Sequence, residues 1–173
     1  MDTLVPGRSG EIDWRHKPVS SLTGFIVERY HAAHRAQLPE LIQLARRVEV
    51  AHAGKDGCPV GLADLLEAFN QELESHMTKE ERVLFPMLVQ GARSQARGPI
   101  SVMRYEHRHH VEALAQIASL TGGLSAPSHA CATWRRLCDG LRQFDEDLNR
   151  HLQLENDVLF SLDSEVAEGA QDA

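Results

Sequence analysis

The sequence predicts an all-α protein whose single domain is an antiparallel up-down-up-down four-helix bundle. Apolar residues recur at alternating steps of three and four along four long segments, the spacing that places them on one face of a helix. Stretches with glycine and proline separate these segments near residues 53–60, 90–99 and 121–128. Helices joined by such short turns lie antiparallel to their neighbours in the chain. Aromatic residues make up only 5% of the chain, which argues against a β-sandwich or barrel.

The first helix is expected over residues 20–51. Before it, residues 1–19 combine proline and glycine with little periodicity, so we expect a flexible lead-in whose Trp14 packs against the bundle. Two serines open the helix as good N-caps. Pro39 lies inside the pattern and should kink the helix or start a new segment, because proline lacks a backbone donor and clashes with the preceding turn. The inward residues should be Gly24, Val27, His31, His34, Leu38, Leu41, Ala45 and Val48.

The second helix should begin near residue 62 and be closed by Pro86 and Gly91. Its inward stripe is notable because a histidine and a glutamate take places that apolar side chains hold elsewhere. In order, the predicted stripe is Leu62, Leu66, Phe69, Leu73, His76, Glu80, Val83 and Met87.

The third helix is expected to start at Pro99, a residue well suited to the first helical position. The fourth should run over residues 128–162 and tolerate Gly140 at a cost of ~1 kcal/mol relative to alanine. The bundle domain is therefore predicted to span 20–162, followed by a small acidic tail over 163–173. The inward residues of these two helices should be Ile100, Met103, His107, His110, Leu114, Ile117, Leu137, Leu141, Phe144, Leu148, His151, Glu155 and Val158.

Charge and composition narrow the function classes. A net charge of −7 argues against a nucleic-acid partner, which would need a basic face. The apolar runs fall far short of the roughly 18 residues that span a bilayer, and the first residues lack the apolar core of a secretion signal. Three cysteines without CxxC spacing indicate neither a disulfide framework nor a zinc ribbon. We therefore expect a cytoplasmic protein with no membrane partner.

One motif occurs twice, and the chain is organised around it. The segments that begin at His76 and at His151 both read HxxxExxVLF. A histidine and a glutamate four residues apart project from the same side of a helix, one turn apart. The Val-Leu-Phe run that follows is expected to be core. Each copy therefore offers two groups that can bind a metal beside an apolar patch.

A simple geometric test predicts that these groups meet. Facing residues of an antiparallel hairpin are equidistant from its turn, so their midpoint in sequence must fall in that turn. The midpoints for His31 with His76, His76 with His107, and His107 with His151 are 53.5, 91.5 and 129. All three lie in or beside the predicted turns. One histidine from each helix should therefore reach a single level of the bundle, with a glutamate one turn away on two helices.

This convergence predicts a metal site with two ions. Carboxylates and imidazoles inside a bundle are costly when left uncompensated, and metal ions remove that cost. The set is too large for one tetrahedral zinc, but it suits two six-coordinate ions bridged by both carboxylates. Imidazole and carboxylate ligands without thiolate favour iron or manganese. The alternative is a metal-free helical interaction module. The predicted ligands are His31, His76, Glu80, His107, His151 and Glu155.

Several other polar residues have two interpretations. His34 and His110 fall on the predicted stripes and are either extra ligands or supporting groups, or edge residues that reach solvent; we favour the second. His52 is expected at the surface or at the end of the first helix, and Glu106 in solvent. Cys131 and Cys138 are expected to serve packing more than redox chemistry. For Tyr30 and Tyr105, packing and control of access to the site explain the sequence equally well.

Longer runs of the sequence resemble one known family. The segments IVERYHAAHRAQLPELI, HMTKEERVLFPM, GPISVMRYEH, ACATWRRL and HLQLENDVLF are similar to the hemerythrin-like domain of the iron-sulfur cluster repair di-iron proteins. The resemblance covers residues 14–162. It implies that the same six residues bind two non-heme irons, with Glu80 and Glu155 as bridges together with an oxo or hydroxo group. Manganese or zinc are the expected substitutes.

The resemblance also implies a role in the cell. It points to a bacterial cytoplasmic stress-response protein that restores iron-sulfur proteins damaged by nitric oxide or oxidation, by donating iron or removing nitric oxide. The alternative is a protein that binds, senses or reduces nitric oxide, or binds oxygen, and only in that case would the site be enzymatic. Family members commonly carry an N-terminal domain with an adjacent cysteine pair, and this chain has no such pair.

Overall fold

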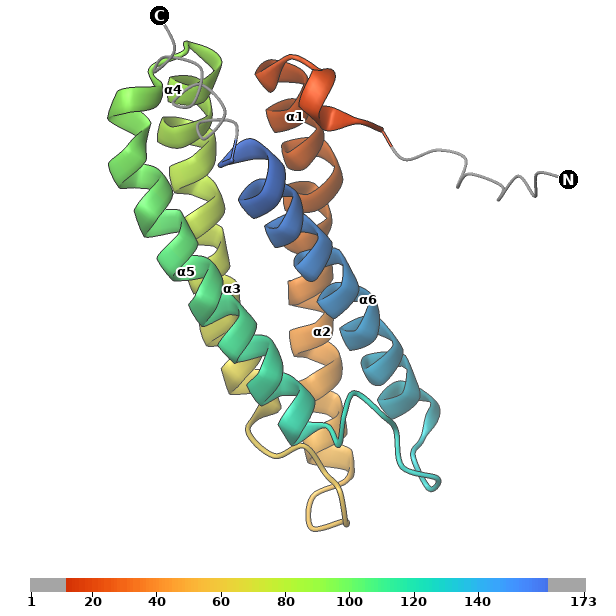
Figure 1. Cartoon of the computed structure of the whole chain (residues 1–173). Coiled ribbons are helices and arrows are strands. Elements are labelled where there is room, and N and C mark those ends of the chain that lie inside the picture. The colour runs from red at the N-terminus through yellow and green to blue at the C-terminus, as the bar shows by residue number, and fades with distance from the viewer. Residues whose placement is uncertain (1–11, 162–173) are drawn as a thin grey trace, which may run out of the picture.

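The computed structural model describes residues 12–161, and within them the chain forms helices and turns with no strand. Four antiparallel helical rods lie side by side (Figure 1). The first two rods are each built of three consecutive segments, and the last consists of two. The segments are α1 (Val19–Ile26), η2 (Val27–His31) and α2 (Ala32–Ala51); α3 (Leu62–Lys79), η3 (Glu80–Leu84) and α4 (Phe85–Val89); α5 (Arg93–Leu120); α6 (Ala132–Leu154) and η4 (Glu155–Leu159).

This arrangement confirms the predicted four-helix bundle. Helix α2 packs against both α3 and α6, and α3 packs against α5. A short 3₁₀ turn, η1 (Trp14–His16), precedes the first rod, and the Trp14 ring lies 4.7 Å from that of Phe25, measured between centroids. The predicted tail of residues 163–173 lies outside the described residues. None of the helices within 12–161 combines the length and apolar character needed to cross a membrane.

Three segments of the rods are π-helical, and they change which residues face inward. A π turn holds one more residue than an α turn, so the stripe beyond it shifts by one position. At the end of η3 and in the residue that follows it, Leu84 and Phe85 are buried, whereas Val83 is 51% exposed. The prediction that Val83 lies in the core was therefore wrong. The same shift makes four other predicted inward residues only partly buried: Gly24, Val27, Met87 and Val158.

The prolines interrupt the helices less than expected. Pro39 lies within α2, which continues without a break, because the proline is exposed while its neighbours Leu38 and Leu41 are buried. Pro99 is not the start of a helix, since α5 already begins at Arg93. Pro86 is the second residue of α4, close to the end of the π turn η3, where the helical hydrogen bonds change register, so its missing N–H does not end the rod.

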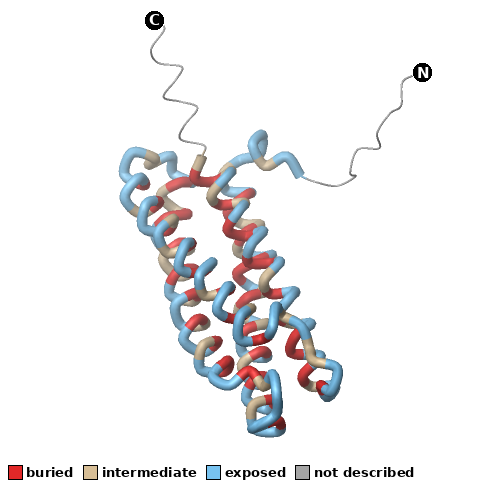
Figure 2. The backbone as a smooth tube through the Cα atoms, turned by 60° about the horizontal axis from the view of Figure 1, so that its bottom comes forward, coloured by how far each residue is buried: buried red, intermediate tan, exposed pale blue. Residues whose placement is uncertain are grey.

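The apolar core is split into two clusters with a polar layer between them. The larger cluster fills the half of the bundle near the α2–α3 turn, and a smaller one lies at the opposite end between α1, α4 and the end of the last rod. Buried positions line the inside of all four rods (Figure 2). A Cβ atom at Gly140 would lie 2.8 Å from Leu41, so glycine here permits a close approach of α6 to α2.

Candidate metal centre

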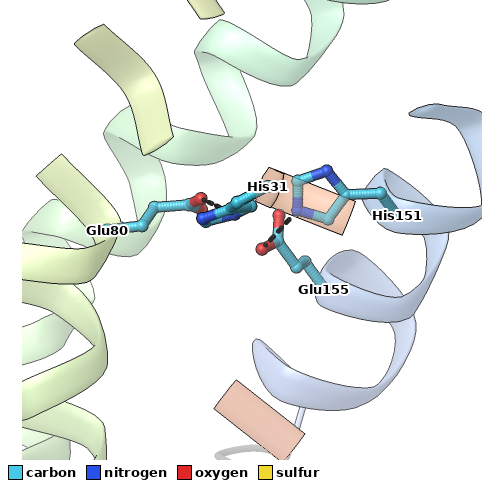
Figure 3. A group of neighbouring side chains, drawn as sticks. All are labelled: His31, Glu80, His151 and Glu155. Atoms are coloured by element: carbon cyan, nitrogen blue, oxygen red, sulfur yellow. Dashed lines mark hydrogen bonds and ion pairs between the residues drawn. The ribbon is translucent and has the colours of Figure 1, made fainter. Parts of the chain in front are cut away.

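The polar layer is formed by the six residues that the sequence singles out. Each of the four rods supplies one histidine, and the second and fourth rods add a glutamate. All six side chains are at most 3% exposed. Their ligand atoms form two overlapping groups, each with all atoms within 4.8 Å of one another. One group is His31, Glu80, His151 and Glu155 (Figure 3), and the other is His76, Glu80, His107 and Glu155.

Each glutamate faces one histidine of either group through a different oxygen. The Glu80 Oε2 and Oε1 atoms lie 3.4 Å from the Nε2 atoms of His31 and His76, respectively. The Glu155 Oε1 and Oε2 atoms lie 3.0 and 3.2 Å from the Nε2 atoms of His151 and His107. All four imidazoles thus turn Nε2 inward, and both carboxylates span the two groups.

The chemistry of this donor set fits two metal ions. Within the described residues, several inward-facing atoms have no hydrogen-bond partner: His31 Nε2, both oxygens of Glu80 and Glu155 Oε2. Buried polar atoms are rarely left this way, because each forfeits its hydration. Two imidazole nitrogens and two carboxylate oxygens per group are ligands that iron, manganese or zinc accept. Together these observations fit metal binding.

The outer nitrogens of three of these histidines are held by specific acceptors. The Nδ1 atom of His31 lies 2.7 Å from Glu81 Oε1, and that of His76 lies 2.8 Å from Glu106 Oε2. His107 Nδ1 lies 3.0 Å from Asn156 Oδ1. Such partners fix the ring orientation of a metal-binding histidine and make it a stronger ligand.

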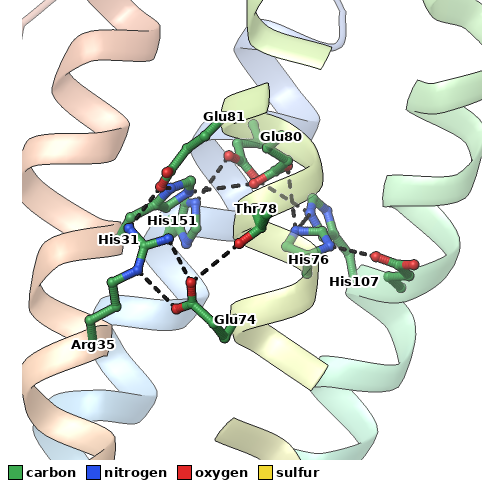
Figure 4. Close-up of polar contacts among 11 residues, drawn as sticks. His31, Arg35, Glu74, His76, Thr78, Glu80, Glu81, His107 and His151 are labelled. Carbon is green, nitrogen blue, oxygen red and sulfur yellow. Dashed lines mark hydrogen bonds and ion pairs between the residues drawn. The ribbon is translucent and has the colours of Figure 1, made fainter. Parts of the chain in front are cut away.

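The carboxylates among these acceptors are themselves anchored. Arg35 donates to Glu81 over 2.8 Å and to both oxygens of Glu74 over 2.8 and 3.0 Å (Figure 4). Lys79 pairs with Glu106. The expectation that Glu106 lies free in solvent was therefore wrong, because its carboxylate turns back toward His76.

Burial and the two glutamates control the protonation of the site when no metal is bound. Burial lowers the pKa of His76, but the negative charges of Glu80 and Glu155 outweigh this effect and raise it to about 9. The same competition leaves the pKa of His31 raised. Burial raises the pKa of Glu155, but His151 and His107 hold it well below the usual range. At neutral pH, the His76 ring therefore carries a proton next to the Glu80 carboxylate.

Other sequence expectations met different outcomes. His34 and His110 are 0% and 2% exposed, so the favoured interpretation of both as solvent-reaching edge residues was wrong. Their rings pack against ligand candidates instead, at centroid distances of 5.3 Å from His151 and 4.8 Å from His76. Both lie one turn beyond His31 and His107, on the side of the layer away from the glutamates.

The remaining residues lie farther from the centre. His52 ends α2 as expected, but it is buried, with its Nε2 atom 3.1 Å from Cys131 Sγ. Cys131 is exposed, so it does not pack as expected, whereas Cys138 is buried. Tyr105 is exposed.

Sequence reasoning did not identify Glu81 and Asn156, although the repeated motif contained the signal. Both follow the glutamate of HxxxE, in corresponding positions of the two copies. Each holds the histidine of the preceding rod: Glu81 holds His31, and Asn156 holds His107.

Comparison with known proteins agrees with this geometry. Residues 25–162 match the hemerythrin HHE cation binding domain. A protein of Edwardsiella ictaluri named iron-sulfur cluster repair protein YtfE is 51% identical over 148 residues, which cover 86% of this chain and 67% of the relative. Proteins of the same name from Dickeya chrysanthemi and Escherichia coli O157:H7 are 47% and 48% identical, covering 88% and 87% of this chain and 69% and 68% of those relatives.

Proposed function

The chain belongs to the hemerythrin HHE cation-binding domain family, and we propose that it is a non-heme di-iron protein of the cytoplasm that repairs damaged iron-sulfur clusters. The names of its relatives support the repair role, because these proteins are identical to this chain at about half of the positions over most of its length. The observation that carries the metal-binding part is the pair of overlapping buried groups that share Glu80 and Glu155. We take residues 20–162 as the functional unit.

In this proposal each group holds one ion. His31 and His151 would bind one iron, His76 and His107 the other, and Glu80 and Glu155 would bridge both. Bound iron would supply a redox-active Lewis acid that can accept a small exogenous ligand. The protein supplies fixed imidazoles, two shared carboxylates and a layer closed by apolar side chains on both sides. Manganese or zinc are the expected substitutes.

Repair of a damaged enzyme is the decisive test. An iron-sulfur dehydratase inactivated with nitric oxide is incubated with the iron-loaded chain, and recovered activity and iron transfer are both measured. We expect the loaded chain to restore activity, and the Glu80→Ala variant, which should hold no iron pair, to restore none. Failure to recover activity together with no release of iron would rule out repair by iron donation.

A second candidate function is binding or reduction of nitric oxide, or binding of oxygen, at the same centre. It is favoured by the position of His107, which lines a surface cavity of about 520 Å³ together with Arg104 and Asn156. A small ligand would reach the layer from this side. An unchanged optical spectrum when the diferrous protein meets nitric oxide or oxygen would rule this function out.

A further inference from the structure

One of the four inward histidines differs from the others at its outer nitrogen. Three of the rings have an oxygen acceptor at Nδ1, supplied by Glu81, Glu106 or Asn156. The Nδ1 atom of His151 is buried with no partner among the described residues. His151 Nε2 lies 3.0 Å from Glu155 Oε1, on the side where a metal would bind. A neutral imidazole that gives Nε2 to a metal carries its proton on Nδ1. That N–H needs an acceptor.

The internal duplication explains why no acidic residue supplies one. His76 and His151 occupy corresponding positions, and the partner of His76 is Glu106, the residue before His107. The corresponding residue before His31 is Tyr30. Its ring stacks on His151 with 5.3 Å between centroids and 7° between planes, so it covers the face of the imidazole and places no carboxylate at its edge.

A different side chain at this place has the required chemistry. His34 is fully buried, and its ring centroid lies 5.3 Å from that of His151. Its Nδ1 atom faces Gln37 Oε1 at 3.4 Å, and its Nε2 atom is buried without a partner among the described residues.

A chain of hydrogen bonds decides which nitrogen of His34 carries the proton. Arg29 donates to Asp147 over 2.8 Å, and Gln37 Nε2 donates to the other oxygen of Asp147 over 3.0 Å. The amide oxygen of Gln37 is thereby turned toward His34, so Nδ1 is the donor and Nε2 keeps its lone pair.

We infer that His34 is a positioning residue for the metal centre: its Nε2 lone pair receives the Nδ1–H of His151 through one bridging buried water, and so orients His151 on its ion. The inference rests on the proposed metal site. It extends the pairing seen at the other three histidines to the fourth, with an imidazole in place of a carboxylate or amide.

His110 provides a matched control within the same chain. It corresponds to His34 in the duplication, is equally buried, and packs against a ligand candidate, His76, at 4.8 Å between centroids. His76, however, already has Glu106 as its partner. Loss of the His110 imidazole removes a similar volume from the same layer without removing the acceptor of a ligand.

The experiment compares the wild-type chain with His34→Phe, His34→Gln, Gln37→Leu and His110→Phe, each loaded with cobalt(II). Metal affinity is measured by competition with a chelator, and proton NMR detects the hyperfine-shifted, exchangeable N–H signals of the bound imidazoles. We expect four protected N–H signals in the wild type. In His34→Phe one of them should be lost to fast exchange, and one of the two ions should bind ~10- to 100-fold more weakly.

The other variants separate positioning from packing. His34→Gln retains an acceptor and should restore the fourth signal, and His110→Phe should keep all four. Gln37→Leu leaves the His34 ring in place but frees its tautomer, so it should weaken the same signal even if His34→Phe folds poorly.

Four protected signals and unchanged affinities in both His34→Phe and Gln37→Leu would overturn the inference. Loss of both ions in His34→Phe would also overturn it, because His34 would then affect more than the ion that His151 binds. Equal effects of His34→Phe and His110→Phe would overturn it as well. A wild-type chain that binds no metal would instead refute the proposed function, and the inference with it.

Discussion

At the scale of single residues, the centre depends on two glutamates that each face histidines of both groups. Glu80 and Glu155 are fully buried, and each presents one oxygen to either side. In the proposed centre, a carboxylate shared in this way would serve two ions at once, whereas each histidine would serve one. The six residues therefore should not be equivalent when they are removed one at a time.

Removal of a single glutamate should cost both ions. We expect the iron content to fall from about two per chain to nearly none in Glu80→Ala and Glu155→Ala, whereas His31→Ala should retain part of its metal. Elemental analysis of protein reconstituted without oxygen measures this content. The exposed Glu67, which pairs with Arg46 at the surface, provides the control, and Glu67→Gln should keep both ions. One ion retained in the glutamate variants would contradict the bridging role.

Metal affinity should rise with pH. His76 has a pKa of about 9 in the metal-free protein, so its ring is protonated at neutral pH, and the pKa of His31 is raised as well. Metal binds the neutral ring, so binding must release this proton. We expect proton release on titration with metal in a weakly buffered solution at pH 7, and a tighter chelator-competition constant at pH 8 than at pH 6. Affinity that does not change with pH would contradict these assignments.

At the scale of elements, the three π segments lie at the ligand candidates. The segment η2 ends at His31, while η3 and η4 begin at Glu80 and Glu155. Each π segment inserts one extra residue into its rod. The inward-facing positions before and after the segment therefore differ by one residue from the spacing of a regular α-helix. π turns of this kind occur frequently at functional sites.

The exposed proline of α2 should be destabilising. Pro39 interrupts the hydrogen bonds of a helix that otherwise continues unchanged, which costs ~3 kcal/mol, partly offset by the stiffer unfolded chain. Pro39→Ala should therefore raise the melting temperature by roughly 4–8 °C for a gain of ~2 kcal/mol. Thermal unfolding followed by circular dichroism measures this, and a lower melting temperature would mean that the bundle needs a bend at this position.

At the scale of the whole molecule, the polar layer divides the apolar core into two separate clusters, each smaller than one continuous core would be. The layer therefore links metal binding to the stability of the fold, because ions that bind only the folded chain shift the folding equilibrium toward it. Both apolar clusters of the bundle border this polar layer.

Metal loading should raise the melting temperature of the entire chain. At a free metal concentration of 1,000 times Kd, one ion adds about 4 kcal/mol, which corresponds to roughly 8–16 °C for a protein of this size. Calorimetry of the iron-loaded protein under nitrogen, before and after addition of a chelator, measures the shift. Equal melting temperatures with and without metal would indicate that the ions do not bind within the folded core.

Much of this molecule follows from local sequence rules. Periodicity alone predicts four helices, because side-chain position on a helix depends only on spacing along the chain. The midpoints of three hairpins then bring His31, His76, His107 and His151 to one level. Their close approach in the structure agrees with that expectation, and their role as ligands remains a prediction.

Only the tertiary structure decided what surrounds these side chains. A π turn moves the stripe by one residue, so Val83 faces solvent although its spacing points inward. Glu106, adjacent to His107, turns toward His76 on another rod, and His34 is enclosed by the rods beside its own. These outcomes depend on the rotation of each rod about its axis and on contacts between rods. Sequence spacing determines which residues share a level, but packing between helices determines which atoms of those residues meet.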